Sequence, residues 1–124
     1  MNNQQVEQLE KAIKVAGANV APRVTMADIE ANVEAEVYFR GDEAAQIPGN
    51  VPAMTDFREK FAQLGCLTFC VLILKNGFTV TGESACASPE NFNAEIGRKI
   101  ARQNAIDKVW PLLGYELRTK LSQP

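Results

Sequence analysis

The sequence predicts an α+β domain in which an antiparallel sheet, centred on a β-hairpin, packs against a long C-terminal helix and shorter N-terminal helices. Two β-rich runs within residues 66–86 flank Asn76-Gly77, a dipeptide typical of a tight hairpin turn. A helix start follows at Ser88-Pro89, ahead of about 20 residues with apolar positions at helical spacing. At 124 residues, with 46% hydrophobic and 23% charged residues, the chain fits a single domain over 1–124.

A first helix is expected over residues 4–16. Val6, Leu9 and Ile13 recur there at helical spacing, with polar side chains between them. Gly17 is a natural end for this helix, because glycine tolerates the left-handed conformation of a C-terminal cap.

A second helix is expected from Thr25, which precedes Asp28 by three residues in a variant of the capping box. Its end stays open, because Val37-Tyr38-Phe39 is also typical of a short strand. Residues 41–54 are rich in glycine, proline and small polar residues, which indicates a long loop.

A short helix is expected after that loop, with Thr55 as its cap. Phe57, Phe61 and Leu64 have the i, i+4, i+7 spacing of one helix face. Gly65 is expected to end it.

The hairpin that follows has an expected register. With Asn76-Gly77 as a two-residue loop, Ile73 lies opposite Val80 on one face, and Leu72 lies opposite Thr81 on the other. The second strand then carries polar groups on one face, which is typical of an edge strand.

The long helix is expected to begin with Ser88 as N-cap and Pro89 in its first turn. Small residues along it would let another backbone approach closely, and Pro111 is expected to end or kink it. The expected buried stripe consists of Phe92, Ile96, Gly97, Ile100, Ala101, Ala105 and Val109.

Charge and composition exclude several classes of protein. The net charge of −2 and the pI of about 5.2 argue against general DNA or RNA binding. From Arg98 onward, however, six basic residues stand against two acidic ones, which suits a small anionic ligand. No apolar segment is long enough to span a membrane and no signal peptide is recognisable, so we expect a cytoplasmic protein without a membrane partner.

The sequence contains no histidine, which excludes Ser/His/Asp and Cys/His nucleophilic sites and every metal site that uses histidine. Zinc spacings and phosphate-binding glycine loops are also missing, so we expect no catalytic residues, no metal and no cofactor. The three cysteines, Cys66, Cys70 and Cys86, are an odd number without Cys-x-x-Cys spacing, which favours reduced thiols over a disulfide framework.

Several side chains suit a ligand that carries phosphates and rings, although each also has a purely structural interpretation. Arg98 and Arg102 lie one helical turn apart and could hold a pyrophosphate, or form a solvated helix face. Phe78 could stack on a purine, or pack in the core. Ser84 or Ser88 could bind a phosphate or a ribose hydroxyl near the helix start, although Ser88 could simply cap the helix. Asn91 could contact a ligand or form hydrogen bonds within the first helical turn.

The order of motifs over residues 66–117 resembles a family of small phage-encoded proteins, some of which are Thoeris anti-defence proteins of the first-described type. The resemblance rests on a run of motifs that consists of Leu74-Lys75-Asn76-Gly77-Phe78-Thr79-Val80-Thr81-Gly82-Glu83-Ser84-Ala85-Cys86, Pro89-Glu90-Asn91-Phe92, Ile96-Gly97-Arg98-Lys99-Ile100-Ala101, Trp110-Pro111-Leu112 and Gly114-Tyr115.

The resemblance implies a protein that sequesters cyclic nucleotide immune signals without cleaving them. The expected ligands are glycocyclic ADP-ribose isomers, together with cyclic dinucleotides or trinucleotides of CBASS immunity. It also implies a homo-oligomer, a dimer or hexamer, with ligand pockets where subunits meet. The ligand-binding residues that it implies are Phe78, Ser84, Asn91, Phe92, Arg98 and Arg102. The alternatives are a phage module that inhibits a host protein by surface contact, and a nucleotide-cleaving enzyme.

Overall fold

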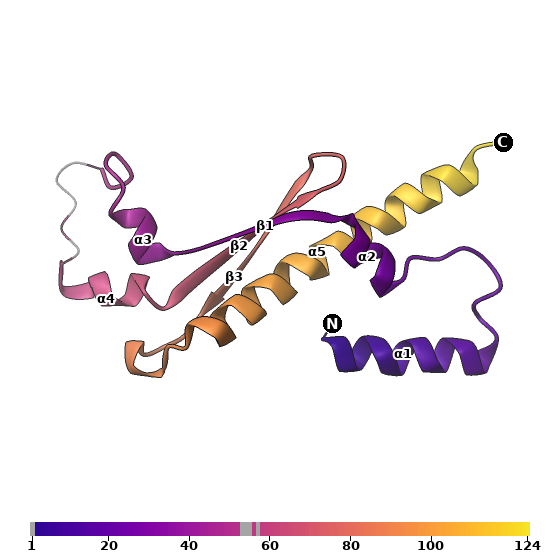
Figure 1. Cartoon of the computed structure of the whole chain (residues 1–124), viewed down its shortest axis with the longest axis horizontal. Coiled ribbons are helices and arrows are strands. Elements are labelled where there is room, and N and C mark those ends of the chain that lie inside the picture. The colour runs from indigo at the N-terminus through magenta and orange to yellow at the C-terminus, as the bar shows by residue number, and fades with distance from the viewer. Residues whose placement is uncertain (1, 53–55, 57) are drawn as a thin grey trace.

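The computed structural model describes residues 2–52, 56 and 58–124, and has the α+β architecture that the sequence predicts. A three-stranded antiparallel sheet of order β1-β2-β3 packs against the long helix α5. The short helices α3 and α4 lie at one end of this elongated arrangement and α1 at the other (Figure 1). The elements are α1 (Asn3–Ala16), α2 (Met26–Asn32), β1 (Val33–Arg40), α3 (Gly41–Ala45), η1 (Arg58–Lys60), α4 (Phe61–Leu64), β2 (Leu67–Leu74), β3 (Thr79–Ala85), η2 (Pro89–Asn91) and α5 (Ala94–Ser122).

Both N-terminal helices form where the sequence predicts them. Gly17, with φ of 70°, ends α1 in the left-handed conformation. The Thr25 side chain accepts a hydrogen bond from the Asp28 amide at 3.2 Å, and the Asp28 carboxylate accepts one from the Thr25 amide at 2.9 Å. This reciprocal capping satisfies two backbone donors that would otherwise lack partners at the start of α2.

The segment after α2 is more regular than expected. The β-prone residues Val37–Phe39 belong to a full strand, β1, which pairs with β2. Residues 41–45 are helical rather than part of the predicted loop over 41–54. Asp42 and Glu43 lie in the first turn of α3, where acidic side chains are favourable, and the Glu43 carboxylate accepts a hydrogen bond from the Arg40 amide. The expected helix beyond it is only partly described: Phe61–Leu64 is helical and ends at Gly65, whereas Thr55 and Phe57 lie outside the described residues.

The hairpin forms, but the expected register is wrong by one residue. Leu72, not Ile73, lies opposite Val80. The turn contains three residues rather than two: the Leu74 amide donates to Phe78 O at 2.8 Å, and the amide of Gly77, at φ of 89°, donates to Leu74 O at 2.9 Å. Relative to the expected register, the shift moves each side chain of β3 to the opposite face, so Val80 shares the buried face with Cys70, Leu72 and Leu74 of β2.

Helix α5 covers this buried face through small and aliphatic side chains. Gly82 of β3 is pressed against the helix, so that a Cβ built there would lie 2.2 Å from Ala101 O and 2.3 Å from Ala105 N. The close approach expected along the small residues of the helix is thereby confirmed. The core consists of Ile29, Cys70, Leu72, Leu74, Val80, Ala101, Ala105, Ile106 and Val109.

Other expectations for this helix need correction. Asn93, rather than Ser88, caps it, because Pro89–Asn91 forms a separate 3-10 turn. The helix also continues through Pro111, since Leu112 and Leu113 beyond it pack against the core and offset the lost backbone hydrogen bond. Ile96 and Ile100 are 56% and 46% exposed and are not part of the buried stripe.

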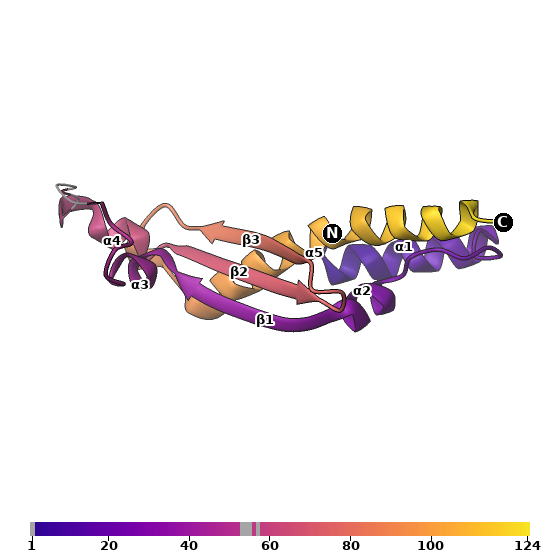
Figure 2. The same cartoon turned by 90° about the horizontal axis from the view of Figure 1, so that it is seen from above.

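The face of the sheet opposite α5 has no covering element among the described residues (Figure 2). It is apolar on β1 and β2, where the rings of Phe39 and Phe69 stack with centroids 5.1 Å apart, and polar on β3. We call it the open sheet face; it consists of Ala35, Val37, Phe39, Leu67, Phe69, Val71, Ile73, Thr79, Thr81, Glu83 and Ala85. None of the described helices has the length and apolar character of a membrane span.

Candidate ligand-binding site

A small cleft lies at the end of the sheet where β1 ends and α5 begins. Its volume is about 150 Å³. The antiparallel pairing of Arg40 with Thr68 and of Tyr38 with Cys70 puts the end of β1 beside the start of β2, next to the connection that carries Phe92. The cleft is lined by Tyr38, Phe39, Arg40, Glu43, Thr68, Phe92, Ala94 and Arg98.

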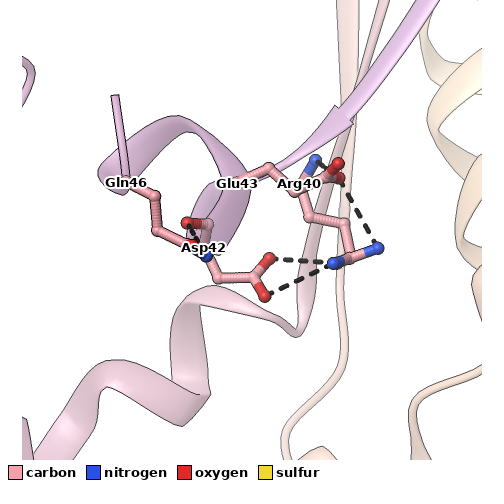
Figure 3. Close-up of polar contacts among 4 residues, drawn as sticks. All are labelled: Arg40, Asp42, Glu43 and Gln46. Carbon is pink, nitrogen blue, oxygen red and sulfur yellow. Dashed lines mark hydrogen bonds and ion pairs between the residues drawn. The ribbon is translucent and has the colours of Figure 1, made fainter. Parts of the chain in front are cut away.

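The two arginines of the cleft differ in their partners. Arg40 is held by α3: its Nε donates to Asp42 Oδ1 at 2.9 Å, and its Nη1 lies 3.5 Å from Glu43 Oε1 (Figure 3). This contact lowers the pKa of the Asp42 carboxyl below its usual value. Arg98, by contrast, makes no side-chain ion pair or hydrogen bond within the described part of the chain. Its positive charge is therefore free to meet an anion beside the Phe92 ring.

Arg102, one turn further along α5, is already neutralised by two carboxylates. Its Nη2 lies 2.7 Å from Glu30 Oε2 on α2, and its Nε lies 2.7 Å from Glu36 Oε2 on β1. The Tyr38 hydroxyl donates to the second oxygen of Glu36 at 2.9 Å. Hydrogen bonding to Glu30 raises the pKa of Arg102, and the same contact lowers the pKa of Glu30. Arg102 therefore does not belong to a solvated helix face, which is one of the two expectations for it. Its ion pairs link α2 and β1 to α5.

The structure brings together some of the residues implied by the family resemblance and separates others. Phe92 and Arg98 line the same cleft, and Ser84 lies nearby, opposite Thr68 on the helix-facing side of β3. Asn91 is exposed at the end of η2. Phe78 lies at the hairpin turn, at the other end of β3, which at about 3.4 Å per residue is roughly 20 Å away.

Phe78 borders a second, larger cavity. This cavity has a volume of about 370 Å³. Lys75 and Glu116 contribute one positive and one negative side chain to its wall, and Leu112 and Leu113 contribute apolar ones. The expected ligand residues are thus divided between two places on one chain.

Sequence reasoning did not identify Tyr38 and Arg40 as residues of the cleft. The β-prone run that ends at Phe39 indicates a strand, but a local pattern does not show which other strand it pairs with. It therefore does not show that Tyr38 and Arg40 lie next to Phe92. Asn104 of α5 also contacts the sheet, since its Nδ2 donates a hydrogen bond to Glu83 O of β3 at 2.7 Å. Within the described ranges, no group of three cysteine, aspartate or glutamate side chains is arranged to hold a metal ion.

Comparison with known proteins identifies a phage family. Residues 24–121, from the start of α2 to the last turn of α5, match the family described as "Phage protein (N4 Gp49/phage Sf6 gene 66) family". The searches of curated proteins and of solved structures gave no match. The matched segment contains the whole sheet, the cleft and the core, and leaves out α1, the connection that follows it and the last three residues. The chain therefore belongs to the N4 Gp49/phage Sf6 gene 66 family of phage proteins.

Proposed function

We propose that the protein is a phage anti-defence sponge that binds cyclic nucleotide immune signals in the host cytosol and releases them unaltered. Glycocyclic ADP-ribose is the first candidate ligand, and cyclic dinucleotides or trinucleotides are the second. The proposal rests on the resemblance of residues 66–117 to Thoeris anti-defence proteins. The observation that supports it most is the unpaired Arg98 beside the Phe92 ring in the cleft.

The cleft offers the groups that such a ligand needs. A guanidinium can donate two parallel hydrogen bonds to phosphate oxygens, and an aromatic ring can stack on adenine. Its volume of about 150 Å³, however, is below the roughly 300–1,000 Å³ of pockets that enclose a whole ligand. A second chain would therefore have to complete the enclosure, in agreement with a homo-oligomer whose pockets lie where subunits meet.

Binding without turnover fits the side chains of the cleft. The carboxylate that lines it, Glu43, accepts a hydrogen bond from the Arg40 amide at 2.9 Å and lies against the Arg40 guanidinium. A carboxylate engaged in this way is a poor general base, and the sequence has no histidine to take that role. We therefore propose that the protein is not an enzyme.

Arg98→Ala tests the site directly. We expect it to weaken binding of glycocyclic ADP-ribose by about 10–100-fold, because a charge-assisted hydrogen bond contributes about 1.5–3 kcal/mol. The measurement is titration calorimetry, followed by denaturation and mass analysis of the released compound. Lys99→Ala is the matched control, because Lys99 is the neighbouring cation, faces solvent and, among the described residues, pairs with Glu95 alone at 3.8 Å. Equal affinity of the Arg98→Ala variant and the wild type, or release of a cleaved product, would contradict the proposal.

The open sheet face supports a protein contact, and we propose a second copy of this chain as its occupant. Val37 is 49% exposed there, and the face carries no charged side chain on β1 or β2. Val37→Lys would place a charge in the proposed interface, so we expect a lower oligomeric state by light scattering with unchanged helix content. Lys75→Ala, at the hairpin turn, is the control. If Val37→Lys leaves the oligomeric state unchanged, a second copy does not bind this face, and a host protein becomes the alternative partner.

A further inference from the structure

Two cysteines lie opposite each other where the hairpin strands end. Leu67 and Ala85 are the last paired residues of β2 and β3, so the next residues outward, Cys66 and Cys86, form the next pair in the same register. A backbone hydrogen bond from the Cys86 amide to Cys66 O, 3.2 Å long, continues the ladder to this pair. We propose that Cys66 and Cys86 form a reversible cross-strand disulfide.

The backbone geometry suits this bond. Opposed residues at a hydrogen-bonded position of an antiparallel ladder, such as this pair, have Cα atoms about 5.5 Å apart, inside the range of about 4.4–6.8 Å that disulfides span. Only one of the two possible backbone hydrogen bonds ties this pair, because the Cys66 amide donates to Gln63 O at 3.0 Å instead. The ends of the strands therefore retain some freedom to bring the sulfur atoms into bonding distance.

The side chains are also placed for reaction with each other. Opposed residues project from the same face of a sheet, and both thiols lie on the side of α5. Burial raises the pKa of the Cys66 thiol, and its contact with the Cys86 thiol raises it further. Cys66 is buried, whereas Cys86 is partly exposed and is the one that an external reagent reaches first.

The third cysteine has no comparable partner. Cys70 lies opposite Gly82 in the middle of the sheet and is fully buried in the core. The three cysteines thus comprise one pair that faces each other across the hairpin and one residue in the core. Sequence spacing does not reveal the pair, because Cys66 and Cys86 become neighbours only through the register of the hairpin.

Oxidation would proceed by two exchange steps with a low-molecular-weight disulfide such as oxidised glutathione. The Cys86 thiolate attacks one glutathione sulfur, which forms a mixed disulfide and releases one glutathione thiol. The Cys66 thiolate then attacks the Cys86 sulfur and releases the second glutathione thiol. The protein loses two hydrogen atoms and one glutathione disulfide becomes two thiols, so atoms and electrons balance.

The disulfide would join two junctions of the fold, α4 to β2 and β3 to η2. The second junction leads through η2 to Phe92, so the cross-link restrains the backbone that carries one wall of the cleft. It would also close a ring around residues 67–85, which restricts the unfolded chain. This modification goes beyond the proposed function and does not depend on any ligand.

The test titrates the full-length protein with buffers of rising oxidised-to-reduced glutathione ratio, then quenches it in acid, alkylates it under denaturing conditions and measures its intact mass. We expect two of the three thiols to disappear together and peptide mapping to find Cys66 linked to Cys86. The oxidised form should melt about 10 °C higher than the reduced form. Because the Cys66 pKa is raised, the second exchange step should accelerate as the pH rises.

Two variants separate this pair from other thiol chemistry. Cys86→Ser should abolish the internal disulfide and the rise in melting temperature. Cys70→Ala should still lose two thiols under oxidised glutathione. If Cys70→Ala does not fold, the peptide map of the oxidised wild type shows whether Cys70 takes part. Retention of all three thiols under oxidised glutathione would overturn the proposal. Glutathione bound to Cys86 with Cys66 still free, or a link between two chains, would overturn it equally.

Discussion

Replacement of Gly82 by alanine is expected to lower the free energy of unfolding by about 3 kcal/mol or more, or to prevent folding. The added Cβ would lie 2.2 Å from Ala101 O and 2.3 Å from Ala105 N. Both are backbone atoms of α5, so no side chain can rotate away, and the helix must move off the sheet. That movement would loosen the contacts of Leu72 and Val80 with the helix throughout the core.

Urea unfolding followed by circular dichroism measures this effect, with a fall in Tm of about 10 °C or more as its thermal counterpart. Gly114→Ala is the matched control, because Gly114 lies in the same helix and a Cβ there has no atom within 4 Å. We expect this control to stabilise the protein by about 0.5–1 kcal/mol, since alanine is the better helix former. A loss below about 1 kcal/mol for Gly82→Ala would show that the helix and the sheet are not in backbone contact.

Local signals in the sequence predict the elements well. The Thr25 capping box, the Gly17 cap and the hairpin around Asn76-Gly77 each depend on residues within a few positions of one another, and all three form. The small residues along α5 likewise predict a close approach by another backbone. Such features are encoded by nearest neighbours, so periodicity and turn chemistry are sufficient to find them.

The register and the site depend on contacts that local patterns do not contain. A turn of three residues or of two leaves the strands equally β-prone, yet it decides whether Val80 lies opposite Leu72 or opposite Ile73. Arg98 and Arg102 look equivalent in the sequence, because both are arginines on one helix. In the structure Arg102 forms ion pairs with Glu30 and Glu36, which lie 72 and 66 residues away in the sequence, whereas Arg98 does not. Local pattern thus predicts Arg98 as a ligand candidate and the family resemblance adds Phe92, but neither identifies their neighbours Arg40 and Tyr38.

The partners of Arg102 make it a structural residue, so Arg102→Met should destabilise the fold by about 1–2 kcal/mol at pH 7. The guanidinium bridges Glu30 of α2 and Glu36 of β1, and its removal would leave two carboxylates close together without a counter-charge. The carboxylates are partly exposed, which keeps the effect well below that of a fully buried pair. Lys99→Met is the control, because within the described part of the chain Lys99 makes a single exposed ion pair, 3.8 Å long, with Glu95 of the same helix.

The difference between Arg102→Met and the wild type should depend on pH in a defined direction. The pKa of Glu30 is lowered in the folded protein by its hydrogen bond to Arg102, so its stabilising contribution is present above the unfolded-state pKa, near 4.5, and is lost as the pH falls through the folded-state pKa. Urea unfolding of both proteins at pH 7 and at about pH 3 checks this. We expect the difference in the free energy of unfolding to shrink at the lower pH, because protonated Glu30 no longer needs the guanidinium. A difference of equal size at both values would mean that Arg102 stabilises the fold by the packing of its aliphatic stem rather than by its charge.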